Sequence, residues 1–132
     1  VIMGSGGPCK PGGRTYVLTG HTIDDRVEGF VMKLLRGVHL TNFKGMERVR
    51  REEGEEGEIV WVRPWYSIPK SSIISWMSSN SHTWFEDSSN HSGSYVRNLV
   101  RRNVIPAMEG VANGGREGLR GRVLGMERQS ED

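Results

Sequence analysis

Cysteine is almost absent from this chain, whose 132 residues include only Cys9. A single thiol excludes an internal disulfide and a zinc site built from several cysteines. Long apolar runs are missing as well, because no stretch reaches the roughly 18 consecutive apolar residues that a membrane-spanning helix needs. We therefore expect no membrane partner, and a location in the cytoplasm or in the matrix of an organelle, a mitochondrion or plastid.

Apolar residues are also scarce, at 35% of the chain, which is below the usual share for a globular domain. The length allows at most one ordinary domain, so we expect a core that is incomplete by itself. The net charge of +2 does not by itself indicate a nucleic-acid partner. Arginines nevertheless gather without acids in residues 97–102 and recur through residues 116–128. Such clusters suit phosphate contacts, or they form a solvated charged face.

Hydrophobic periodicity predicts a short series of strands and helices. The apolar positions between residues 27 and 35 form one helical stripe, and Gly37 is placed to end that helix. The charged run 48–58 is predicted to be a solvated loop, and Pro106 to break or kink the last helix. The expected elements, in order, are an irregular lead-in at 1–13, a strand at 15–19, a helix at 23–36, a strand at 59–62, helices at 69–79 and 94–105, and a flexible Gly/Arg-rich tail at 110–132.

The order strand, helix, strand, helix, helix is typical of the second half of a doubly wound α/β domain with a parallel sheet. Two short strands do not form a stable sheet alone. Parallel strands are normally covered on both faces. We therefore expect a second protein chain to complete this sheet.

Four polar side chains near the start of the first helix are the first candidate site: His21, Asp24, Asp25 and Glu28. If the helix extends back to His21, their spacing places all four on one face, at the carboxyl end of the first strand. There they can bind a substrate ammonium group, hold Mg²⁺ with Asp24 and Asp25, or position a base. Alternatively, the two aspartates only cap the helix and complement its dipole.

A second set of candidates is basic or amide-bearing. Arg36 and Arg63 follow a helix and a strand; either arginine can contact phosphate, or Arg36 can complement the helix dipole and Arg63 can pair with an acid. The segment from 87 to 101 combines side chains that suit a turn with two arginines one helical turn apart, which suits RNA contact. Its alternative role is a buried Asp–Arg network that orders the loop. The residues concerned are Asp87, Asn90, Arg97, Asn98 and Arg101.

Five short motifs occur in a suggestive order: His-x-x-Asp-Asp-x-x-Glu at 21–28, Leu-Leu-Arg-Gly at 34–37, Val-Arg-Pro at 62–64, Glu-Asp-Ser-Ser-Asn at 86–90 and Tyr-x-Arg-Asn-x-x-Arg at 95–101. Together they resemble the tRNA-isoleucine lysidine synthetases, of the PP-loop ATP pyrophosphatase superfamily, over roughly residues 14–109. The resemblance implies the second half of a PP-loop domain with a C-terminal helical extension. It also implies that the acidic motif lies beside ATP and lysine, and that the later motifs help to receive tRNA.

Some positions depart from the family pattern. Arg26 replaces the usual Gln and places a cation next to the carboxylates, and Gly29 replaces the usual Thr. The family's Ser-Gly-Gly-x-Asp-Ser loop is missing, since Ser5-Gly6-Gly7 is followed by Pro8. Without the amides of that loop, this chain alone is expected to bind neither ATP nor Mg²⁺ and to be inactive.

Two hypotheses follow from the resemblance. In the first, the chain is part of a split lysidine synthetase that joins lysine to the wobble cytidine of tRNA, and another chain supplies the ATP-binding loop. In the second, it is a catalytically inactive relative that serves as a structural subunit of an RNA–protein assembly such as an organellar ribosome, where its RNA partner is ribosomal RNA.

Overall fold

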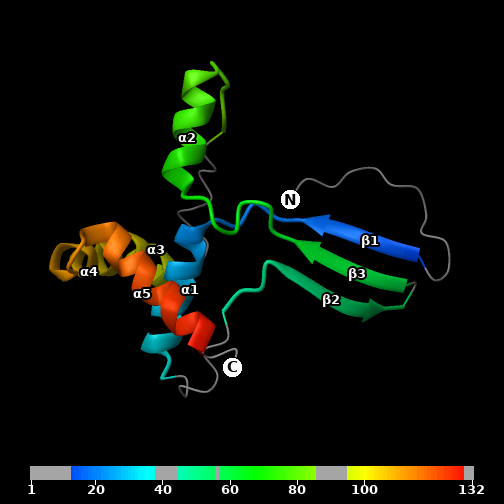
Figure 1. Ribbon diagram of the computed structural model, residues 1–132, viewed down its shortest axis with the longest axis horizontal. Helices are drawn as coiled ribbons and strands as arrows, with labels where there is room; N and C mark the ends of the chain where they lie inside the picture. Colours follow the sequence, from blue (N-terminus) through cyan, green and yellow to red (C-terminus); the bar gives the residue numbers. More distant parts are fainter. Residues whose placement is uncertain (1–12, 38–44, 56, 86–94, 130–132) are drawn as a thin grey trace.

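The computed structural model describes residues 13–37, 45–55, 57–85 and 95–129 (Figure 1). They form a small α/β structure with a three-stranded sheet at one side and most of the helices at the other. The elements, in chain order, are β1 (Gly13–Leu18), α1 (Ile23–Leu35), β2 (Val49–Gly54), β3 (Gly57–Val62), α2 (Lys70–Ser79), α3 (Tyr95–Leu99), the π-helical segment η3 (Val100–Val104), α4 (Ile105–Val111) and α5 (Gly115–Gln129).

The sheet has the strand order β1-β3-β2. The strands predicted at 15–19 and 59–62 are confirmed as β1 and β3, which run parallel. The prediction that the charged run 48–58 forms a loop is wrong, because most of this run forms β2, which pairs with β3 in an antiparallel hairpin. Its charged side chains stay near solvent and pair across the hairpin, as in the ion pair between Arg51 and Glu58 at 3.3 Å. The sheet is therefore mixed, not wholly parallel.

Helix α1 forms where its apolar stripe predicts it. Its first turn is capped by Asp25 Oδ2, which accepts hydrogen bonds from the Thr22 N–H at 2.8 Å and from the Thr22 hydroxyl at 2.9 Å. Gly37 follows the last turn with a φ of 71°, a left-handed conformation that favours glycine. The helix begins at Ile23, as predicted, so the condition that it extends back to His21 is not met.

The predicted helix at 94–105 is present as α3 and η3, and it continues past Pro106 into α4. The wide turn of η3 lies immediately before the proline, where a regular helix would lose a hydrogen bond and clash with the ring. The prediction of a flexible tail at 110–132 is wrong over residues 115–129, which form α5. Tertiary packing favours the helical conformation of this segment, because Leu119 and Val123, which lie one helical turn apart, are both buried.

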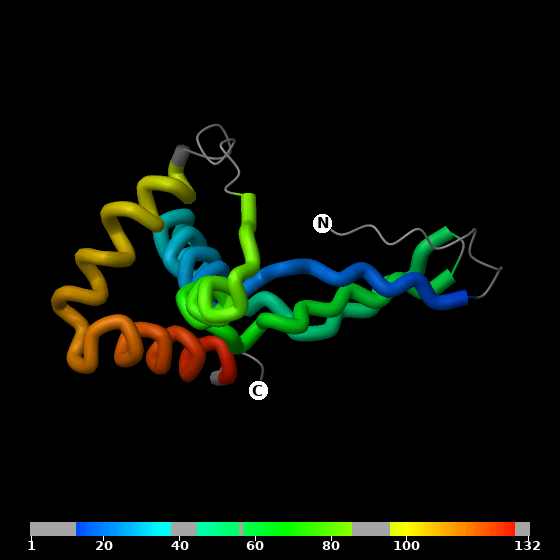
Figure 2. Tube along the Cα trace, turned by 90° about the horizontal axis from the view of Figure 1, so that it is seen from above, coloured from blue at the N-terminus to red at the C-terminus, as the bar shows by residue number. Residues whose placement is uncertain are grey.

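The hydrophobic core lies between α1 and α5 and consists of Val27, Phe30, Leu119 and Val123. The sheet extends away from this group of helices (Figure 2). Helix α2 stands apart and has no buried residue, so the buried side predicted for it is wrong in this structure. Strand β1 lies at the edge of the described sheet, with Tyr16 and Leu18 more than half exposed. A partner that completes the sheet remains a prediction.

Candidate functional site

The three carboxylates of the acidic motif lie at the start of α1, just beyond the carboxyl end of β1. Open α/β sheets bind their ligands at this end of the strands. Asp24 faces two elements at once: its Oδ2 accepts the backbone N–H of Lys70 at 2.7 Å, and its Oδ1 accepts Arg120 Nη2 at 2.5 Å. Asp24 thus ties the first turn of α1 to the start of α2 and to Arg120 in α5.

Asp25 and Glu28 are hydrogen-bonded to arginines of α3 and η3. Arg97 Nη2 donates to Asp25 Oδ1 at 3.1 Å, and Arg97 Nε donates to Glu28 Oε2 at 2.9 Å. Arg101 makes a bidentate contact with Glu28, with Nε at 2.6 Å and Nη2 at 2.9 Å. Glu28 is only 3% exposed, so these charge-assisted bonds offset the cost of burying its charge.

The predicted catalytic acids and the predicted RNA-binding arginines therefore contact each other. In this network the acids are Asp25 and Glu28 of α1. The loop-ordering Asp–Arg network predicted for the segment 87–101 involves residues outside the described ones and stays a prediction. Asn98 lies between the two arginines in sequence and is half-buried. Asp87 and Asn90 lie outside the described residues, so their predicted roles are untested.

The other predicted site residues do not join this network. His21 precedes α1, and its Nδ1 lies 2.9 Å from the hydroxyl of Thr19. Arg36 is the exposed C-cap residue of α1, and its two predicted roles stay predictions. Arg63 follows β3 and donates from Nη1 to the backbone carbonyl of Glu47 at 2.6 Å.

Arg63 also lines a hollow of about 300 Å³ together with Gly45, Met46, Glu47 and Arg50. Its Nε is buried, and within the described part of the chain no group accepts a hydrogen bond from it. A buried donor without an acceptor is costly. The phosphate contact predicted for Arg63 stays a prediction.

Sequence reasoning missed two site-forming residues, Arg120 and Glu127, because they lie in the segment predicted to be flexible. The buried Arg26 donates to Glu127 Oε2 from Nη2 at 2.5 Å and stacks over the ring of Tyr66, 3.7 Å from its centroid. The prediction that Arg26 places its cation beside the motif carboxylates is therefore wrong. A signal for this helix was present in the sequence: the apolar residues Leu119 and Val123 are spaced one helical turn apart, with the charged residues Arg120 and Glu127 close to them.

The pKa of Asp24 reflects opposing effects. Burial alone would raise it, but the hydrogen bonds from the Lys70 N–H and Arg120, with the nearby positive charges, lower it below its ordinary value. A carboxylate with a lowered pKa stabilises the fold above its unfolded pKa, and this contribution is lost as the pH falls through the folded pKa. Asp24 is therefore charged and paired at neutral pH.

Replacing Gly29 with Ala is expected to stabilise the chain. A Cβ built at Gly29 meets nothing within 4 Å, and glycine inside a helix is less favourable than alanine by roughly 0.5–1 kcal/mol. Urea unfolding of the Gly29→Ala variant should show an increase of that size in the free energy of unfolding. A decrease would mean that residue 29 is packed more tightly than the structure indicates.

The described residues do not fit a resident Mg²⁺ ion. They contain no group of three His, Cys, Asp or Glu side chains that could hold a metal, and the carboxylates of Asp24, Asp25 and Glu28 already accept hydrogen bonds from arginine.

The described part of the chain also includes no helix that is long and apolar enough to cross a membrane.

Comparison with known proteins places this chain in a family. Similar proteins include the tRNA(Ile)-lysidine synthases of Ralstonia nicotianae (33% identical, covering 79% of this chain and 21% of the relative), Treponema pallidum (33%, covering 81% and 21%) and Prochlorococcus marinus (36%, covering 77% and 28%). The chain therefore spans roughly a fifth to a quarter of the length of these relatives. Residues 7–108 match the model of the PP-loop domain, and the chain belongs to that family.

Proposed function

We propose that this chain forms part of a tRNA(Ile)-lysidine synthase, which uses ATP to attach lysine to the wobble cytidine of tRNA. The Ser-Gly-Gly-x-Asp-Ser loop, a motif that these 132 residues do not contain, is supplied from outside them. One observation carries the proposal: the motif acids of α1 meet Arg97 and Arg101, which come from a motif about 70 residues later. The names of the relatives support the choice of reaction.

The contacts suggest separate roles for the acids. Asp25 and Glu28 act as positioning residues, because they hold Arg97 and Arg101 in place for RNA. Asp24 is the most exposed of the three acids, at 32% against 22% for Asp25, and it is assigned to the ammonium group of lysine. Arg63 is assigned to a phosphate of the RNA. The proposal routes no step through Mg²⁺ or ATP in this chain.

One observation favours a second function. All three motif acids are paired with arginines, so the network is stable without any ligand. Such a network suits a subunit that keeps the fold and has lost the reaction. The second candidate is therefore a structural role in an RNA–protein assembly.

The test uses the chain with every polypeptide that co-purifies from its native source. This assembly is incubated with ATP, Mg²⁺, lysine and tRNA, and lysidine is measured by nucleoside mass spectrometry. We expect lysidine to form, and an Asp24→Asn variant to lower its rate at least roughly 30-fold, as expected for losing a charged partner. The matched control is Arg122→Gln, which changes an exposed residue of α5.

Two outcomes overturn the proposal. One is that the complete assembly forms no lysidine. The other is that Asp24→Asn assembles normally and retains the full rate. An assembly that forms no lysidine but contains ribosomal RNA and many proteins would support the structural role instead.

A further inference from the structure

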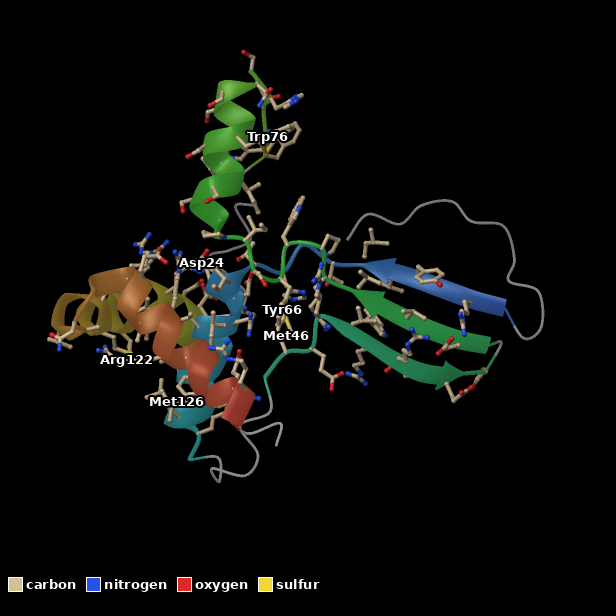
Figure 3. The ribbon with its side chains drawn as sticks, viewed as in Figure 1. Asp24, Met46, Tyr66, Trp76, Arg122 and Met126 are labelled. Atoms are coloured by element: carbon tan, nitrogen blue, oxygen red, sulfur yellow. The ribbon has the colours of Figure 1, made fainter. Side chains whose placement is uncertain are left out.

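The helical segment that runs from α3 through η3 into α4 is attached to the rest of the fold in two ways. Arg97 of α3 and Arg101 near the start of η3 both bind the buried carboxylate of Glu28. Further along, Ile105 and Met108 of α4 pack against the hydrophobic core between α1 and α5. The whole segment lies beside these helices, on the side of the molecule away from the sheet (Figure 3).

The π-turn of η3 sets the angle between the two attachments. The N–H of Ile105 donates to the carbonyl of Val100, five residues earlier, where a regular α-helix bonds residues that are four apart. One extra residue in a turn rotates every later side chain by roughly 100° relative to the earlier ones. Because α4 is fixed by burial in the core, a regular helix here would turn Arg97 and Arg101 away from Glu28.

Pro106 is the residue that favours the π-turn. It has no N–H to donate to the carbonyl of Arg102, and in a regular helix its ring would clash with that carbonyl. The wider turn avoids the clash and needs no donor at residue 106. The segment Val100–Val104 contains neither glycine nor proline, so without Pro106 nothing in its own sequence opposes a regular helix.

The two arginines stay accessible while they are held. Their side chains are 37% and 42% exposed, and their bonds to Asp25 and Glu28 use only Nε and Nη2 of each guanidinium. A guanidinium that a carboxylate already orients on one edge loses less conformational freedom when it binds a phosphate on another. The contacts with Glu28 therefore prepare Arg97 and Arg101 for an anionic ligand.

We propose that Pro106 is a positioning residue, which acts through the π-turn to keep both arginines on Glu28 in the orientation that binds an RNA phosphate. The RNA phosphate rests on the proposed function, whereas the coupling of Pro106 to the contacts with Glu28 does not. Removing the proline should loosen the arginines. Removing one residue of the turn as well should restore them, because the turn then becomes regular while α4 keeps its orientation.

The first test follows the Nε–H proton of Arg101 by NMR, in the full chain with its co-purifying polypeptides and with isotope-labelled arginine in this chain only. Pro106→Ala should speed the exchange of this proton with water at least roughly tenfold, as expected for weakening a hydrogen bond between charged groups. Pro106→Ala combined with deletion of Asn103, an exposed residue of η3, should restore slow exchange. The matched control is Pro69→Ala, which replaces a proline at the start of α2.

The second test measures lysidine formation by the same assembly at varied concentrations of tRNA. Pro106→Ala should raise the KM for tRNA at least roughly tenfold, the cost of one weakened charge-assisted contact, and should change kcat less. The double variant should return the KM close to that of the unmodified chain, and Pro69→Ala should leave it unchanged. A general loss of folded protein would instead lower the apparent kcat.

The outcomes separate the positioning role from the proposed function. Unchanged exchange of the Arg101 proton in Pro106→Ala, no recovery on deletion of Asn103, or an unchanged KM overturns the proposal. If Pro106→Ala does not fold, the double variant decides: slow exchange in it supports the proposal, and a second failure to fold overturns it. Loosening and recovery of Arg101 in an assembly that forms no lysidine would support the positioning role and reject the proposed reaction.

Discussion

Replacing Arg26 with Ala is expected to lower the free energy of unfolding by about 3–5 kcal/mol, the cost of removing one partner of a buried ion pair. Both side chains of the Arg26–Glu127 pair are buried, so the change leaves the carboxylate of Glu127 without its cation. It also removes the stacking of the guanidinium on Tyr66. Urea unfolding monitored by circular dichroism measures the loss.

Two matched variants separate this effect from a general loss of charge. Arg122→Ala removes an exposed arginine of α5 and should change stability by less than about 0.5 kcal/mol. A double replacement, Arg26→Met with Glu127→Leu, removes both charges and should recover most of the loss, because an apolar pair of similar volume avoids the desolvation cost. A loss below about 1 kcal/mol for Arg26→Ala would contradict the buried pair.

Phe30→Ala is the second change with a large expected effect, a loss of about 3–5 kcal/mol. Phe30 is 4% exposed and belongs to the cluster that joins α1 to Leu119 and Val123 of α5. Its removal leaves a cavity at this junction, and the few other apolar contacts there cannot compensate for it. Thermal unfolding and hydrogen exchange together measure the loss and its location.

The control for Phe30 is Leu35→Ala in the last turn of the same helix. Leu35 is 61% exposed, so its truncation should cost less than about 0.5 kcal/mol. Equal losses for the two variants would mean that the core does not lie between α1 and α5. Faster exchange confined to α5 in Phe30→Ala would show that α5 undocks before the chain unfolds globally.

Several elements were predictable because their signals are local. The apolar stripe from Val27 to Leu35 and the glycine at 37 predicted α1 and its end. The β-branched and aromatic runs predicted β1 and β3. The acidic motif was a candidate site from its spacing, because a helix start places Asp24, Asp25 and Glu28 within one to two turns of each other, and the family resemblance identified it.

The missed elements depend on distant partners. Strand β2 consists mostly of charged residues, and only its pairing with β3 makes it a strand. Helix α5 has the composition of a flexible tail, and only its docking on α1 makes it a helix.

By itself, then, the sequence determined the helix and strand positions that rest on local propensity, the acidic motif and the family resemblance. Only the tertiary structure decided which charges meet. Glu28 pairs with Arg97 and Arg101, Asp24 with Arg120, and Arg26 with Glu127. Each arginine could have paired with many acids, and the partner is chosen by burial: a charge removed from water needs an opposite charge within reach, and the packing of α1, η3 and α5 determines which one that is.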